Sequence, residues 1–188
     1  MKKAILFAFI ILNSSFLISA QQANLDSLWG VWNDNTQTDS ARVAAYADYV
    51  IKGFLYTNPD SAIALSEDMH RFAQERNYPK ASVRAYSLQG TGCLLQGNYP
   101  KALDYLEKSL KISEEIGDMV GMAKGFSNIG SVYIFQANYP KALEFFEKCL
   151  AIFKVIGDKQ SIANVLANIG SIYSAQNNYS RAVEYIEK

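Results

Sequence analysis

The feature that most constrains this chain is a sequence repeat with a step of 40 residues. The segment 98–103, Asn-Tyr-Pro-Lys-Ala-Leu, returns unchanged at 138–143 and as Asn-Tyr-Ser-Arg-Ala-Val at 178–183. Residues 88–127 and 128–167 are identical at 16 of 40 positions, which chance does not explain. A repeat of this length is typical of solenoids, in which each unit buries its apolar face only against its neighbours.

Each unit has the pattern of two helices joined by a tight turn. Apolar residues recur at helical spacing between charged ones over residues 102–112. Asn98 is suited to cap the start of this helix, and Pro100 fits its first turn, where no N–H donor is required. Gly117 predicts the left-handed residue that ends the helix, and Asp118 the cap of the next one.

Small residues recur inside these helices. A glycine in a helix costs about 1 kcal/mol relative to alanine, so its recurrence needs a reason. Small residues on facing helices let two backbones approach closely, and we expect bulky residues of the same period to fill the space between hairpins. The first helix of each unit carries Gly90, Gly130 or Gly170, the second carries Ala102, Ala142 or Ala182, and the bulky residues include Leu106, Phe146 and Ile186. The pattern predicts an all-α solenoid of antiparallel helix hairpins.

The order of small and large residues at Gly130, Tyr133, Ala142 and Phe146 resembles the tetratricopeptide repeat. The usual repeat has about 34 residues, so this chain is similar to the longer variant of kinesin light chains and Rap-type peptide receptors. The resemblance covers residues 82–188. It implies that the all-α solenoid is a right-handed superhelix. It also implies a protein-binding scaffold rather than an enzyme, with a protein or peptide as the partner.

The remaining chain divides into three further parts. We expect a signal peptide at 1–20, a capping helix and linker at 21–38, and a divergent hairpin at 39–81, in which Val50 stands where the repeat predicts glycine. Residues 82–188 form the array, with two full units and a truncated third. Because the third unit has only begun its second helix at Lys188, we expect the natural protein to continue.

The first twenty residues have the features of an export signal. Lys2 and Lys3 precede an apolar run at 4–12, and the small Ala20 precedes Gln21, which suits cleavage between them. The run is short for a bilayer about 30 Å thick, although an anchor that stays attached is the alternative. We therefore expect a periplasmic or secreted protein.

The residues that carry chemistry are sparse. Lysine plus arginine and aspartate plus glutamate number 18 each, so no basic field suggests nucleic acid. The lone His70 is expected on the surface, and Cys93 and Cys149 are expected to be buried thiols. We expect no catalytic centre, metal, cofactor or small-molecule substrate.

The predicted binding surface is the concave face, which the first helices line. Asn128 and Asn168 resemble the repeated asparagine that bonds the backbone of an extended peptide in the longer-variant family. An amide can pair with both a peptide N–H and a C=O. The alternative is that each asparagine bonds its neighbouring hairpin. The other predicted peptide-binding residues are Arg84, Ser87, Lys124, Ser131, Asn164 and Ser171, and Leu88 is expected to be exposed beside them.

A second function stays open at this point. The segments 39–43 and 58–62 resemble parts of exported bacterial sensors, in which a membrane helix and a histidine kinase, cyclase or DNA-binding domain follow. In that case the chain would be the sensory region of a larger signalling protein. Its membrane association would come from a segment after Lys188.

Overall fold

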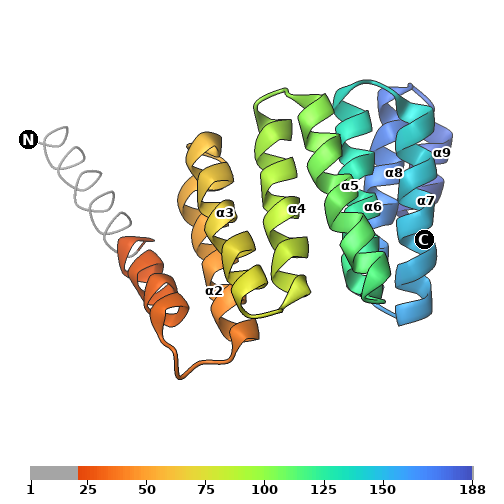
Figure 1. Ribbon diagram of the computed structural model, residues 1–188. Coiled ribbons are helices and arrows are strands. Elements are labelled where there is room, and N and C mark those ends of the chain that lie inside the picture. The colour runs from red at the N-terminus through yellow and green to blue at the C-terminus, as the bar shows by residue number, and fades with distance from the viewer. Residues whose placement is uncertain (1–20, 188) are drawn as a thin grey trace, which may run out of the picture.

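The computed structural model describes residues 21–187, so the predicted signal peptide lies outside the described residues. Residues 21–33 are helical, and helical hairpins joined by short turns follow (Figure 1). Within 21–187 no helix is both long and apolar enough to cross a membrane. The elements are α2 (Asp39–Val50), η1 (Ile51–Leu55), α3 (Pro59–Glu75), α4 (Pro79–Leu95), α5 (Tyr99–Glu115), α6 (Met119–Phe135), α7 (Tyr139–Ile156), α8 (Lys159–Ala175) and α9 (Tyr179–Ile186).

The helices stack as consecutive antiparallel hairpins. Figure 1 shows them side by side, from α2 and α3 at one end of the stack to α8 and α9 at the other. The most extensive contacts join helices that follow one another in the chain, such as α4 with α5 and α6 with α7. The predicted all-α solenoid is confirmed. Helix α4 begins at Pro79, three residues before the predicted start of the array at 82, because proline occupies its first turn.

The predicted caps set the limits of the helices. The Asn98 side chain accepts a hydrogen bond from the backbone N–H of Lys101 at 3.3 Å, and Asp118 accepts one from Gly121 at 3.0 Å. Gly117 has a φ of 67°, in the left-handed region where glycine is favoured. These local signals set where α5 begins and ends and where α6 begins, as the sequence predicted.

The glycines let the two helices of a hairpin meet. A Cβ atom placed on Gly90 would lie 2.6 Å from Leu106 Cγ, and one on Gly130 would lie 3.1 Å from the Phe146 ring. Leu106 and Phe146 are fully buried. Each covers a glycine of its own hairpin, and each also belongs to a cluster with the next first helix, Leu106 with Ile129 and Phe146 with Ile169. They therefore fill space within their own hairpins as well as the predicted space between hairpins.

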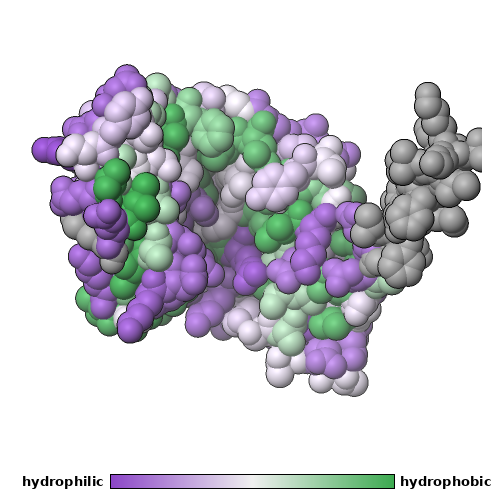
Figure 2. Space-filling model, turned by 180° about the vertical axis from the view of Figure 1, so that it is seen from behind, coloured by the Kyte–Doolittle hydropathy of each residue, from purple (hydrophilic) through white to green (hydrophobic). Residues whose placement is uncertain are grey.

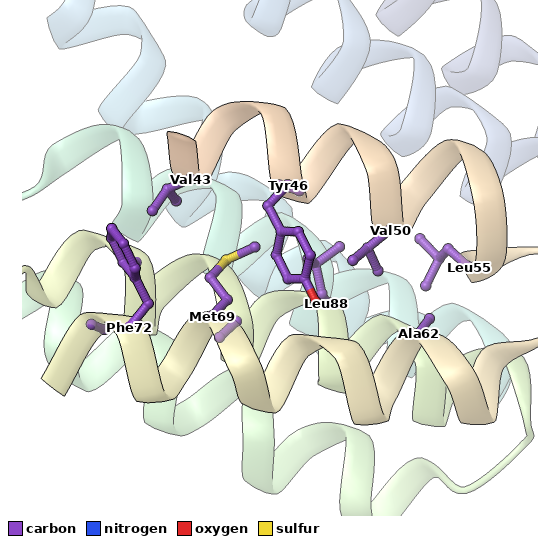
Figure 3. Close-up of a cluster of buried hydrophobic side chains, with 12 residues drawn as sticks. Val43, Tyr46, Val50, Leu55, Ala62, Met69, Phe72 and Leu88 are labelled. Carbon is purple, nitrogen blue, oxygen red and sulfur yellow. The ribbon is translucent and has the colours of Figure 1, made fainter. Parts of the chain in front are cut away.

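The first hairpin exchanges large and small residues at these positions. Val50 replaces the glycine, and Ser66 replaces the bulky residue opposite, 40 residues before Leu106; both side chains are fully buried. The π-helical turn Ile51–Leu55 follows Val50 directly. Helices α2 and α3 meet along less of their length than α4 and α5 do. Without a glycine the backbones cannot approach as closely, and side chains such as Tyr46 and Met69 fill the wider gap (Figure 3).

The helix at residues 21–33 covers the outer side of this first hairpin. The Trp32 ring stacks on Tyr46 with centroids 4.2 Å apart. Arg42 donates from Nε to the Trp32 carbonyl at 2.8 Å, and its guanidinium lies 5.6 Å from the centre of the Trp32 ring. Aromatic and cation–π contacts therefore attach the N-terminal helix to the stack.

The two cysteines are free thiols, and both side chains are fully buried. Burial raises the pKa of the Cys93 thiol, and it raises the pKa of Cys149 to about 11. The predicted pair of buried thiols is confirmed. Both cysteines serve the fold as small apolar side chains.

The turn between the first and second helices leads to a stability prediction. It places a residue in the left-handed region in each repeat, namely Gly97, Ala137 and Asn177, with φ angles of 74°, 54° and 59°. This conformation costs a residue with a Cβ atom about 1–2 kcal/mol. Ala137→Gly should therefore raise the free energy of unfolding by about 1 kcal/mol in urea denaturation. Gly97→Ala should lower it by a similar amount, and a lower stability for Ala137→Gly would contradict this explanation.

The close approach at Gly90 leads to a second prediction. Gly90→Ala should lower the unfolding free energy by about 1–2 kcal/mol, because the clash with fully buried Leu106 outweighs the helix propensity of alanine. Gly170→Ala is the matched control: both substitutions place a Cβ 3.2 Å from a backbone oxygen, but at Gly170 the side chain that it meets is Ile186, which is 67% exposed and free to move. The control should therefore be less destabilising than Gly90→Ala in the same thermal and urea measurements. Equal effects of the two substitutions would refute the close-approach argument.

Candidate functional site

The first helices of the units form one layer of the stack, and a hollow of about 180 Å³ lies between two of them, α6 and α8. Seen from behind, the molecule is hollowed near its middle, and hydrophilic side chains gather in the depression (Figure 2). Four predicted site residues line the hollow between α6 and α8: Lys124 and Asn128 from α6, and Asn164 and Asn168 from α8. Lys124 and Asn164 are 40 residues apart, as are Asn128 and Asn168, so the members of each of these two pairs lie at the same height on α6 and α8.

The two asparagines of the predicted ladder lie on the same hollow. Asn128 and Asn168 are both half-buried. Neither carboxamide has a hydrogen bond with another residue between 21 and 187, so no bond to a neighbouring hairpin occupies it there. Two donors and an acceptor on each amide are therefore oriented by the helices and open to a ligand.

The other four predicted residues do not line this hollow. Arg84 lies 3.9 Å from an Asp48 oxygen, and the Ser87 and Ser109 hydroxyls are 2.9 Å apart. Ser131 and Ser171 each donate to the carbonyl four residues earlier in their own helix. These hydroxyls are engaged within the fold.

The prediction that Leu88 is exposed on the concave face is wrong. Its side chain is 5% exposed and belongs to the apolar cluster of the first hairpin, where it lies near Val50 (Figure 3). The wider gap beside Val50 leaves room for this leucine. The asparagine position is therefore part of the core in the first clear unit and part of the surface in the next two.

The lining of the hollow between α6 and α8 includes polar side chains and one positively charged side chain. Lys124 is the charged side chain among those that line it. Hydrogen bonds from Ser161 lower the pKa of the nearby Asp158 below its usual range, and the charge of Lys124 contributes to the same shift. Because Asp158 is occupied in capping α8, the hollow offers amides, hydroxyls and an ammonium group. Such a set suits a peptide backbone and an acidic side chain.

Besides Ser127 on α6, the hollow is lined by three residues that were missing from the sequence prediction: Phe153, Ser161 and Val165. Ser161 comes three residues after the Asp158 cap, so the cap signal already placed it in the first turn of α8. Phe153 belongs to a second helix and reaches the hollow through the packing of α7 against α8, which no local pattern encodes. No group of three metal-binding side chains occurs among residues 21–187.

Comparison with known proteins agrees with this architecture. A tetratricopeptide repeat family model matches residues 121–188. BtubC from P. vanneervenii superposes with a TM-score of 0.64 at 14% identity, over 94% of this chain and 72% of that one. The apo form of RapI superposes with a TM-score of 0.64 at 20% identity, over 89% of this chain and 60% of that one. These likenesses show a shared fold.

A third structure is a signal transduction ATPase with a tetratricopeptide repeat sensor, from Pyrococcus horikoshii. It superposes with a TM-score of 0.63 at 19% identity, over 80% of this chain and 24% of that one. No curated protein sequence matches the chain. Residues 121–188 therefore match the tetratricopeptide repeat model, and the preceding hairpins share the fold of the tetratricopeptide repeat structures.

Proposed function

We propose that the protein is an extracytoplasmic scaffold that binds an extended peptide, or an extended segment of a partner protein, across the hollow between α6 and α8. The observation that carries this proposal is the pair Asn128 and Asn168, half-buried at equivalent places with their amides unoccupied within the described chain. A peptide in this groove satisfies both asparagines through its own N–H and C=O groups.

The chemistry of the hollow narrows the segment it takes. Lys124 favours an acidic side chain one turn away from the asparagine contacts, whereas a basic segment would meet an unbalanced positive charge. Phe153 and Val165 add an apolar part to the lining. The proposed ligand is therefore an extended segment with an acidic and an apolar residue.

The proposed location rests on the sequence of residues 1–20, with its two lysines, short apolar run and small Ala20 before Gln21. The sensory role in a larger signalling protein stays a prediction. The ATPase from Pyrococcus horikoshii joins a sensor of this fold to an output region in one chain. That arrangement is an analogy at the level of fold.

The asparagine pair can be tested with a displayed library of random peptides. Peptides selected on the protein should bind Asn128→Ala/Asn168→Ala at least about tenfold more weakly, because each lost amide removes hydrogen bonds worth about 1 kcal/mol. Titration calorimetry measures the affinity, and circular dichroism should show unchanged helix content and melting.

The matched control is Asn24→Ala/Asn35→Ala, which makes the same chemical change at two exposed asparagines outside the groove. The control should bind the selected peptides as the unchanged protein does. Full affinity in the Asn128/Asn168 variant, with its fold intact, would rule out the asparagine ladder.

A further inference from the structure

The second helices carry a separate hollow that the peptide groove does not explain. It has a volume of about 380 Å³ and lies between α3 and α5, with α4 as its floor. Because second helices frame it, whereas first helices frame the hollow between α6 and α8, the two open on opposite layers of the stack. Its lining includes His70, Tyr86, Gln89 and Tyr105, with Arg71 and Lys108 exposed at its rim.

Three residues that line this hollow (His70, Tyr86 and Gln89), and Ser82, which contacts His70, are polar in this unit alone among the units compared. Four polar residues, one on α3 and three on α4, stand where the following units have only apolar side chains. In those units the equivalent residues belong largely to apolar clusters, so the fold does not need polar groups there. The polar set is His70, Ser82, Tyr86 and Gln89, and the equivalents are Leu110, Met122, Phe126 and Ile129, then Leu150, Ile162, Leu166 and Ile169.

Three members of this set form hydrogen bonds with one another, whereas the fourth, Gln89, leaves its side-chain oxygen without a hydrogen-bond partner. His70 Nδ1 lies 3.0 Å from Ser82 Oγ, and its Nε2 lies 3.3 Å from the Tyr86 hydroxyl. These contacts hold His70 half-buried at the surface, between α3 and α4, where it lines the hollow. The sequence predicted a surface position for it and did not predict these contacts. Gln89 is only 3% exposed, and its Oε1 has no hydrogen-bond partner. A buried oxygen without a donor destabilises the fold, and isoleucine at the same place in the next unit avoids this.

The aromatic rings and charged side chains around Gln89 indicate what kind of ligand could donate a hydrogen bond to its Oε1 atom. Tyr86 stacks on Tyr105 with centroids 6.1 Å apart, and His70 lies 4.8 Å from Tyr86, so the wall suits a planar ring. Arg71 is paired with Asp68 at 2.8 Å, and Lys108 with Asp104 at 2.7 Å. These pairs leave no net positive charge for an anionic ligand, and the carboxylate of Glu67 also lines the hollow. A neutral ring is compatible with this mixed lining, and the cationic side chains of Arg71 and Lys108 favour an electron-rich ring.

We propose that this hollow binds a neutral heteroaromatic ring of the indole type, whose N–H donates to Gln89 Oε1. The ring stacks beside Tyr86 and Tyr105 and lies under the side chains of Arg71 and Lys108. The same chemistry belongs to a free indole compound and to a tryptophan side chain of a partner protein. This site is independent of the peptide groove and holds whether or not that groove binds peptides.

The single histidine of the chain gives a clean probe. Titration with indole, followed by the NMR signals of the His70 imidazole, should give a saturable shift with a dissociation constant on the order of 1 mM. Because 1-methylindole lacks the N–H donor, it should bind about tenfold more weakly. Absence of a saturable shift with indole, or equal affinity for the two compounds, would overturn the proposal.

A parallel titration with N-acetyltryptophanamide distinguishes the two sources of the ring. Saturable binding of both this compound and indole supports a tryptophan side chain of a partner. Binding of indole alone supports a free small molecule. Both outcomes support the same ring chemistry at Gln89.

The decisive variant is Gln89→Ile, which installs the residue of the next two units. It should weaken indole binding at least about tenfold while the melting temperature stays equal or rises, because an unpaired buried oxygen is removed. Gln136→Ile makes the same change at an exposed glutamine and should leave indole binding unchanged. Unchanged indole binding in Gln89→Ile, or a lower melting temperature that shows a structural role for the glutamine, would overturn the proposal.

Discussion

The contact between a glycine of the first helix and a bulky side chain of the second determines the geometry of each clear hairpin. At Gly90 and Gly130 the missing Cβ atom leaves space that Leu106 and Phe146 fill completely. Interiors of proteins are close-packed, so this contact fixes the distance between the two helices. The distance in turn sets where the next hairpin can lie, and the grooves on both layers depend on that spacing.

Much of the fold could be predicted from the sequence because its signals are local or periodic. Asn98 and Asp118 cap helices through atoms three residues away, and Gly117 ends one through its own backbone conformation. The 40-residue step then carries these local features from unit to unit. The additional contact of Leu106 with Gly90 in its own hairpin could not be read in this way, since it depends on the rotation of two helices about their axes.

The candidate site could also be predicted where it depends on the repeat period, and not where it depends on the packing of neighbouring hairpins. Lys124, Asn128, Asn164 and Asn168 meet because the repeat places them at equal heights on neighbouring first helices. Leu88 has the same place in the repeat as Asn128, yet it is buried because the preceding hairpin differs around Val50. The surroundings of a repeat position come from both neighbouring units. The periodic pattern of one unit therefore does not decide whether that position faces solvent, the core or a ligand.

The exchange at Val50 and Ser66 has a consequence for how such arrays can change by recombination. A first helix with valine is matched to a second helix with serine, whereas a first helix with glycine is matched to a leucine or phenylalanine. A crossover between the two helices of a hairpin would join valine to leucine, which collide, or glycine to serine, which leave a void. A crossover at the turn between hairpins keeps each matched pair together. The hairpin, rather than the single helix, is thus the module that gene duplication and shuffling can transmit intact.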